Sequence, residues 1–128
     1  MKILIFIPLF LFSNNALPDW IKYGTRNNGD VLYYDSKIQA INKEYRVVWI
    51  LANFSQMRND RTKSGTAKIQ IDCKLYKYQY LKFVYLERPM GRGKKQKEVL
   101  KETPEWIERP NETPYVYLFQ EVCDRKQF

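Results

Sequence analysis

Two cysteines downstream of an apolar N-terminal segment constrain this chain most strongly. Lys2 precedes an unbroken apolar run over residues 3–12, and a short stretch of small and polar residues then ends at Ala16. This layout is typical of a secretory signal peptide, and the run is shorter than the roughly 20 residues of a membrane-spanning helix. We predict a signal peptide over residues 1–16, cleaved after Ala16, and one exported domain over residues 17–128. A short hydrophobic strand or an uncleaved anchor is the alternative.

The two cysteines are Cys73 and Cys123. An exported chain meets an oxidising environment, in which a cysteine pair forms a disulfide. The bridge would close a loop of about 50 residues and, in the chain-entropy model, stabilise the domain by about 4 kcal/mol. Two buried free thiols are the alternative, which is common in cytosolic proteins. The predicted leader favours the disulfide, and a mature domain of about 112 residues has a small core that a cross-link supports.

Alternating apolar residues predict an α+β domain built on a single antiparallel β-sheet of about six strands. Asn27 to Asp30 carries a hairpin turn signal between the first two strands. The segment 45–54 is apolar on both faces, which predicts a central strand. Residues 75–86 are expected to form one long bent strand or two strands joined by a bulge. The expected strands cover residues 20–23, 31–34, 45–54, 67–73 and 75–86.

The C-terminal segment has the pattern of a helix. Thr113 and Pro114 form a helix start, and an apolar stripe at helical spacing follows, with Cys123 beside it. We therefore predict a C-terminal helix that packs on one sheet face and is tied to it by the Cys73–Cys123 disulfide. A final strand over residues 115–122 is the competing interpretation, because this segment is also rich in strand-forming residues. The stripe consists of Tyr115, Leu118, Phe119 and Val122.

The remaining segments are expected to be loops or short helical turns. Asp35 and Ser36 are expected to cap a brief helical turn at residues 37–40, and a second such turn is expected at residues 103–106. Residues 57–66 are polar and predict a loop. Residues 87–102 contain proline, glycines and a lysine cluster, and they predict a segment of little regular structure.

Positive charge is concentrated in one part of the sequence. The formal net charge is +8, and the segment 88–101 carries six basic residues against one acidic residue, Glu98. A smaller basic cluster lies at residues 58–63. Such clusters attract anions, and salt screens that attraction. A solvated loop that aids solubility is the alternative. The candidate binding residues are Arg88, Arg92, Lys94, Lys95, Lys97 and Lys101.

Several kinds of chemistry lack the residues they need. The chain has no histidine, and its two cysteines are not in C-x-x-C spacing, so we predict no catalytic residues, no metal site and no cofactor. The carboxylates Asp72, Glu87 and Glu105 have no spacing that marks a catalytic pair. The segment 91–95 lacks the spacing of a phosphate-binding loop. No nucleic-acid motif is present, and the mature chain has no apolar stretch long enough to span a membrane.

An ordered set of residues along the chain resembles the bacterial surface-adhesin protein E-like family. The resemblance implies an antiparallel sheet with a C-terminal helix held on its concave side by the disulfide. It also implies dimerisation and an extracytoplasmic location in a Gram-negative bacterium, with binding to host extracellular-matrix proteins by the founding member. The set follows the leader and comprises Asp19-Trp20, Gly29, Val31–Asp35, Val47–Trp49, Asp72-Cys73, Tyr85, Met90–Gly93, Trp106 and Cys123.

These observations predict a non-enzymatic binding protein of the periplasm or the outer-membrane surface. One helix covers only one sheet face, so the second face, which carries Tyr45 and Trp49, is the predicted interface. The expected partners are a host matrix protein or an anionic glycan, or a second copy of the chain in a homodimer. The alternative function is a periplasmic structural or envelope-interaction protein with no host ligand.

Overall fold

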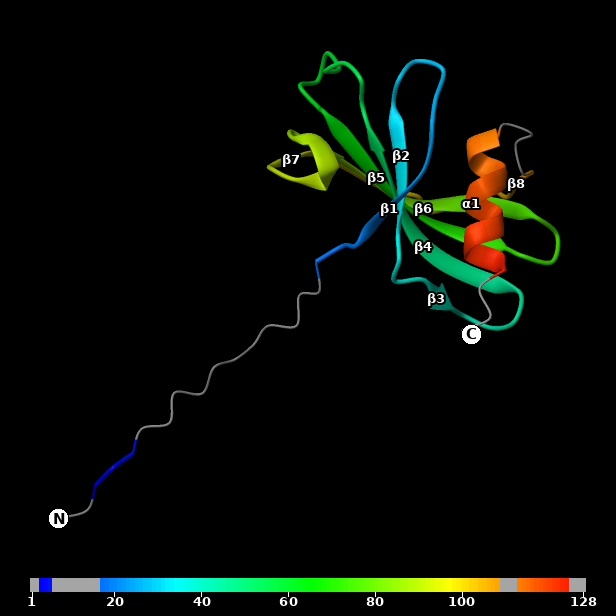
Figure 1. Cartoon of the computed structure of the whole chain (residues 1–128), viewed down its shortest axis with the longest axis horizontal. Helices are drawn as coiled ribbons and strands as arrows, with labels where there is room; N and C mark the ends of the chain where they lie inside the picture. Colours follow the sequence, from blue (N-terminus) through cyan, green and yellow to red (C-terminus); the bar gives the residue numbers. More distant parts are fainter. Residues whose placement is uncertain (1–2, 6–16, 109–112, 125–128) are drawn as a thin grey trace.

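The structure is a computed structural model, and it describes residues 3–5, 17–108 and 113–124 of the 128-residue chain. The predicted leader falls largely on residues 6–16, so the predicted cleavage after Ala16 lies outside the described residues. Among the described residues, one α-helix, one short 3-10 helix and eight strands occur (Figure 1). The elements are β1 (Trp20–Thr25), β2 (Val31–Asp35), β3 (Gln39–Ala40), β4 (Tyr45–Asn53), β5 (Ser64–Asp72), β6 (Lys77–Leu86), η1 (Pro89–Gly91), β7 (Lys95–Leu100), β8 (Ile107–Glu108) and α1 (Thr113–Cys123).

All strand pairings are antiparallel, as predicted, in the order β1-β2-β4-β5-β6-β7. The prediction of about six strands is wrong in number, because β3 pairs with β4 and β8 pairs with β6 as two further strands. Strands of two residues are too short to show an alternating pattern in the sequence. The sheet is curled, and β1 and β7 form the two edges of its main path.

Strand β4 lies inside the sheet, as its apolar character predicts. It pairs with β2 on one side and with β5 on the other. Val48 and Ile50 point to the face that carries the main core, whereas Val47, Trp49 and Leu51 point to the opposite face. Because both faces of β4 carry apolar side chains, each needs a cover.

Strand β6 is a single long strand with a bulge at Leu81. Lys68 pairs with Lys82, whereas the next residue, Ile69, pairs with Tyr80, so Leu81 has no opposite partner in β5. The sequence left open one long bent strand or two strands joined by a bulge over residues 75–86, and the structure has one strand that contains a bulge. The bulge shifts the alternation of β6 by one position. As a result, Tyr80 and Phe83 point to the same face, although they are three residues apart.

Helix α1 confirms the helical interpretation of the C-terminal segment. Cys123 forms the predicted disulfide with Cys73, and their Cα atoms are 5.6 Å apart. Leu118, Phe119 and Val122 are buried in one cluster with side chains of β1, β2, β4, β5 and β6. The ring of Phe119 meets Tyr78 edge-on, with 5.9 Å between ring centroids. We call the sheet side that carries this cluster the helix face.

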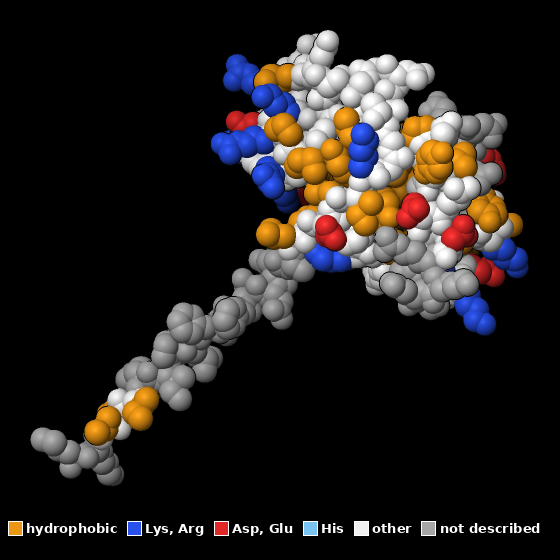
Figure 2. Space-filling view, viewed as in Figure 1, with side chains coloured by type: hydrophobic (Ala, Val, Ile, Leu, Met, Phe, Trp, Pro, Cys, Tyr) orange, Lys and Arg blue, Asp and Glu red, His pale blue; other side chains and the backbone are white. Residues whose placement is uncertain are grey.

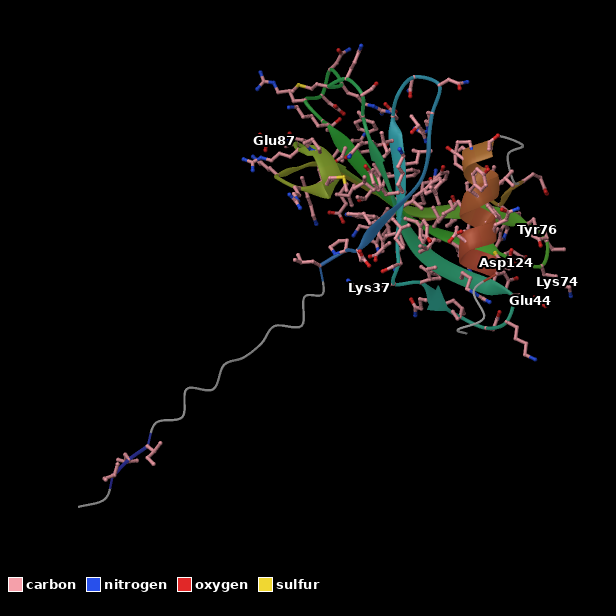
Figure 3. The ribbon with its side chains drawn as sticks, in the orientation of Figure 1. Lys37, Glu44, Lys74, Tyr76, Glu87 and Asp124 are labelled. Atoms are coloured by element: carbon pink, nitrogen blue, oxygen red, sulfur yellow. A yellow bond between two sulfur atoms is a disulfide. The ribbon has the colours of Figure 1, made fainter. Side chains whose placement is uncertain are left out.

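The start of α1 approaches β1 closely at Gly24. A β-carbon at position 24 would lie 2.8 Å from Cβ of Pro114, too near for two carbon atoms. Glycine therefore allows the first turn of the helix to contact the strand backbone. At the far end of the sheet, the turn between β5 and β6 meets the turn before β4, where Lys74 and Glu44 form an ion pair of 3.6 Å (Figure 3).

Both predicted short helical turns are wrong. Asp35 accepts a hydrogen bond of 3.1 Å from the Lys37 N–H, but this closes a turn and leads into β3 instead of a helix. Residues 103–106 are irregular, and Trp106 stacks on Tyr45, with ring centroids 6.0 Å apart. Tertiary pairing with β4 and β6 decides both segments, which local sequence cannot indicate.

The basic segment is more ordered than its composition predicts. Residues 87–102 contain η1 and the six-residue strand β7, which contradicts the expectation of little regular structure. The predicted loop at residues 57–66 is likewise shorter, because β5 begins at Ser64, whose side chain is fully buried. No helix among the described residues has the length and apolar character needed to cross a membrane.

Candidate functional site

The sheet face opposite the helix face, here called the second face, carries an open groove. Trp49 of β4 projects onto this face beside Lys68 of β5 and Lys82 of β6, which follow one another across the sheet. The groove has a volume of about 650 Å³. It is lined by Leu17, Pro18, Trp20, Asp35, Trp49, Thr66, Lys82, Val84, Leu86, Met90, Gly91, Arg92 and Lys95.

One wall of the groove is η1, which two polar side chains fix to the sheet. Asn53 and Ser64 are paired residues at the end of β4 and the start of β5. The Asn53 side-chain oxygen accepts from the Met90 N–H at 2.6 Å, and the Ser64 hydroxyl accepts from the Gly91 N–H at 3.0 Å. The same hydroxyl donates to the Arg88 carbonyl at 2.6 Å. These bonds give hydrogen-bond partners to the Arg88 carbonyl and to the N–H groups of Met90 and Gly91.

Gly91 allows this wall to lie against the sheet. Its φ is +69°, and a β-carbon there would lie 3.2 Å from Leu51 Cδ1 and 3.4 Å from Thr66 Cγ2. Both the backbone conformation and the contact distance therefore favour glycine.

Replacing Gly91 by alanine should lower the free energy of unfolding by about 1–2 kcal/mol, because the turn must strain or lift from Leu51. Chemical denaturation measures this change. Lys94→Ala, an exposed position in the same segment, is the control and should change stability by less than about 0.5 kcal/mol. Equal stability of the two variants would contradict the contact between η1 and the sheet.

The structure separates the six basic residues predicted as a binding cluster. Arg92 and Lys95 line the groove. A register shift at Gln96 pairs Lys97 with Tyr85 but Lys95 with Leu86, so Lys97 belongs to the helix face and Lys95 to the second face. Arg88 packs beside Gly93, and Lys94 is exposed outside the groove lining. Lys101 follows the end of β7, where its N–H donates to the Leu81 carbonyl.

Part of the positive charge at the groove is neutralised within the chain. Glu98 forms ion pairs with Lys82 and with Lys95, the latter at 3.8 Å. A hydrogen bond from Lys82, together with the charges of Lys82 and Lys95, holds the pKa of Glu98 below its ordinary value. Asp35 also lines the groove. Of the three basic residues in the groove lining, Lys82 and Lys95 therefore form ion pairs with Glu98. Arg92 takes part in no ion pair among the described residues.

Trp20 and Lys82 are two of the groove residues that were not among the predicted site residues. Trp20 is the first residue of β1, and its ring lies near Gly91. Lys82 faces the groove because of the bulge at Leu81, which inverts the alternation that β6 shows at its start. The tryptophan was visible as an aromatic residue in an expected strand, but no sequence signal located the bulge.

The second face is covered at its other end by residues of the same chain. Trp106 stacks on Tyr45, and the Lys77 ammonium lies 5.1 Å from the centre of the Trp106 ring. Tyr45 was predicted to belong to the interface, but this stacking occupies one side of its ring. Trp49 lies between this cover and η1, so it is the aromatic residue of β4 that reaches the groove.

Figure 2 shows how charge and apolar surface are distributed on one side of the molecule. Lysine and arginine side chains gather at the end that holds β7, η1 and the 54–63 loop, next to an apolar patch. Among the described residues, no three histidine, cysteine, aspartate or glutamate side chains gather in a way that could hold a metal ion. The arrangement combines flat apolar rings with cationic groups, which suits the binding of an anion with an extended apolar surface.

Comparison with known proteins finds one matching family and solved structures with a similar fold. The model of the surface-adhesin protein E family matches residues 20–124. The structure of Haemophilus influenzae protein E superposes with a TM-score of 0.60 at 15% identity, covering 82% of this chain and 83% of that one. Protein E from non-typeable Haemophilus influenzae gives a TM-score of 0.58 at 18% identity, with coverages of 82% and 75%. At these identities the likeness shows a shared fold. No curated protein matches the sequence significantly.

Proposed function

Because the chain belongs to the surface-adhesin protein E family, we propose that it is an exported, non-enzymatic adhesin of a Gram-negative bacterium. The proposed contact site is the groove on the second face. The proposed ligand is an anionic glycan chain, either free or attached to a host matrix protein. One observation carries this proposal: Arg92 and Lys95 line the same groove as Trp20 and Trp49.

The groove offers two kinds of interaction that a sulfated or carboxylated glycan uses. The flat faces of tryptophan rings pack against the apolar C–H face of a sugar ring. A guanidinium group presents donors in a planar fork that matches a carboxylate or sulfate. Because Glu98 already pairs with Lys82 and Lys95, Arg92 is expected to make the strongest single contact with the ligand.

Charge outside the groove has a different role. The segment 88–101 carries a net charge of +5, from six basic residues and Glu98. This field attracts any anion at a distance and is screened by salt. This long-range attraction does not depend on the direction in which each lysine side chain points, whereas direct contact with a ligand in the groove does. The two contributions can therefore be separated by mutating residues of one segment that lie in different places.

The double variant Arg92→Glu, Lys95→Glu should bind immobilised heparin, a sulfated glycan, about tenfold more weakly than the original chain at physiological salt. The reason is the loss of two cations that line the groove. Surface plasmon resonance over a range of salt concentrations measures the affinity and its salt dependence.

The matched control is Lys94→Glu, Lys97→Glu, which changes the net charge equally in the same segment but at positions outside the groove lining. It should retain most of the affinity at physiological salt. An equal loss in both double variants would mean that net charge alone drives binding, and it would contradict a contact site in the groove. Absence of heparin binding by the original chain would contradict the proposed ligand.

A further inference from the structure

A second cavity lies on the helix face, near the N-terminal end of α1, where Arg26 of the cavity lining contacts Tyr115. Its volume is about 150 Å³. Ala52, Gly65 and Ala67 form its floor on β4 and β5, where Ala52 pairs with Gly65 and Ile50 pairs with Ala67. These residues have little or no side chain, so the sheet is hollowed between the larger side chains around them.

Aromatic and apolar side chains form the walls of this cavity. Tyr23 and Leu32 stand on the side of β1 and β2, and Tyr80, Phe83 and Tyr85 stand on β6. Tyr80 and Phe83 lie close together, with ring centroids 4.7 Å apart. The volume of this half-open cavity is roughly that of a cavity able to hold one benzene ring.

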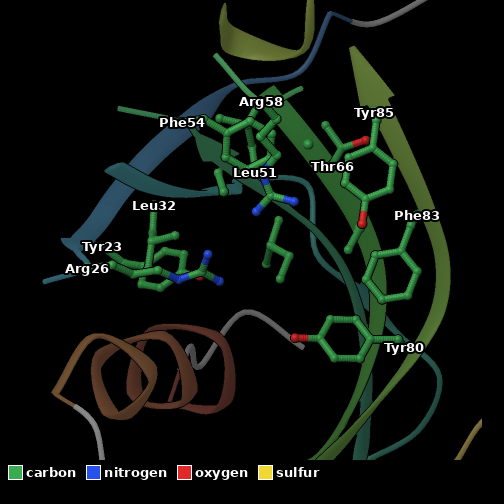
Figure 4. Close-up of a pocket in the computed structure, with 14 residues that line it drawn as sticks. Tyr23, Arg26, Leu32, Leu51, Phe54, Arg58, Thr66, Tyr80, Phe83 and Tyr85 are labelled. Atoms are coloured by element: carbon green, nitrogen blue, oxygen red, sulfur yellow. The ribbon is translucent and has the colours of Figure 1, made fainter. Parts of the chain in front are cut away.

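Two arginines converge on the same space from different segments. Figure 4 shows Arg26, which follows β1, and Arg58, from the loop between β4 and β5, with both guanidinium groups directed toward the cavity. The Arg58 guanidinium lies 4.0 Å from the centre of the Phe54 ring, which holds it over the opening. Arg26 donates to the Tyr115 hydroxyl at 3.0 Å and lies 3.7 Å from Asp30.

Both charged side chains in the cavity lining are arginines, and an acidic residue outside the lining lies near each of them. Asp30 forms an ion pair with Arg26. Asp60 is near Arg58, although the hydrogen bond from Thr62 is the first cause of its lowered pKa and Arg58 contributes less. Burial raises the pKa of Tyr23 and of Tyr80, so both phenols stay neutral at neutral pH and add no negative charge to the cavity. Guanidinium groups and phenols all donate hydrogen bonds to an anion.

We propose that this cavity binds a carboxylate attached to one ring-sized apolar group, with the carboxylate between Arg26 and Arg58 and the apolar group against Ala67 and Phe83. A free aromatic acid has this chemistry, and so does the C-terminal phenylalanine of a peptide. The cavity lies on the opposite sheet face from the groove, so this inference does not depend on the proposed function.

The test uses 3-phenylpropionate, and in a second arm an N-acetylated tripeptide that ends in phenylalanine with a free carboxyl group. Saturable shifts of the backbone amide signals of Gly65, Ala67 and Phe83 are expected in NMR titrations. Arg58→Gln should weaken binding about tenfold or more, because a hydrogen bond to a charged group is lost. The arm with the higher affinity identifies the source of the carboxylate.

Two controls make the result specific. Arg61→Gln removes an equal charge from the same loop but at a position outside the cavity lining, and it should change the affinity by less than about twofold. The neutral alcohol 3-phenyl-1-propanol should bind about tenfold more weakly than the acid. Equal affinity of acid and alcohol, equal loss in Arg58→Gln and Arg61→Gln, or no saturable shift at these amides with either ligand would overturn the proposal. Arg58 is exposed, so its replacement should not impair folding.

Discussion

Replacing Cys73 and Cys123 together by alanine should lower the free energy of unfolding by about 4 kcal/mol. The bridge joins residues 50 positions apart, and its removal restores the conformational freedom of that loop in the unfolded chain. For a domain of this size, such a loss corresponds to a decrease in melting temperature of about 15 °C or more. Thermal and chemical denaturation followed by circular dichroism measure both quantities.

Reducing agent provides the control for this prediction. The original chain should lose stability when a strong reductant is added, whereas the double alanine variant should be unaffected by it. A double variant with the stability of the oxidised original chain would show that the bridge contributes little. Reductant sensitivity in the variant would point to a cause other than this disulfide.

Replacing Phe119 by alanine should lower the free energy of unfolding by about 3–5 kcal/mol, the range for truncating a buried aromatic side chain. Phe119 is 1% exposed, and its ring meets Tyr78 of β6 edge-on. The substitution leaves a cavity between α1 and the sheet and removes this ring contact. Denaturant titration measures the loss.

Tyr117→Ala is the matched control, since Tyr117 is an aromatic residue of the same helix but 53% exposed. It should cost less than about 1 kcal/mol, because the side chain is largely exposed and alanine has the higher helix propensity. Similar losses in the two variants would contradict the packing of α1 on the sheet through Leu118, Phe119 and Val122. The comparison therefore tests which side of the helix stabilises the domain.

Some parts of the fold could be predicted from sequence because they depend on local patterns. The apolar character of residues 45–54 predicts the interior position of β4, and the stripe at helical spacing predicts α1. The disulfide was predictable because the chain has only two cysteines. Local patterns also predicted a strand over residues 75–86, with a bend or a bulge as open alternatives, and β6 contains a bulge.

Other parts depend on contacts between distant segments. Strand β7 is polar and follows a glycine-rich turn, so nothing in its own sequence predicts that it pairs with β6. The turn η1 is held by Asn53 and Ser64, which are 37 and 27 residues away from the N–H groups they bind. Strands β3 and β8 exist only because β4 and β6 offer pairing partners.

The sequence by itself determined the chemistry that is available: one disulfide, an excess of positive charge in the segment 88–101, and apolar faces on both sides of β4. The tertiary structure decided which of these groups meet. Lys95 and Lys97 are two residues apart and would share a face in a regular strand, yet the irregularity at Gln96 places them on opposite sheet faces. The bulge at Leu81 likewise directs Lys82 toward Trp49. A single inserted residue exchanges the two faces of a strand, and its position is set by pairing across the sheet.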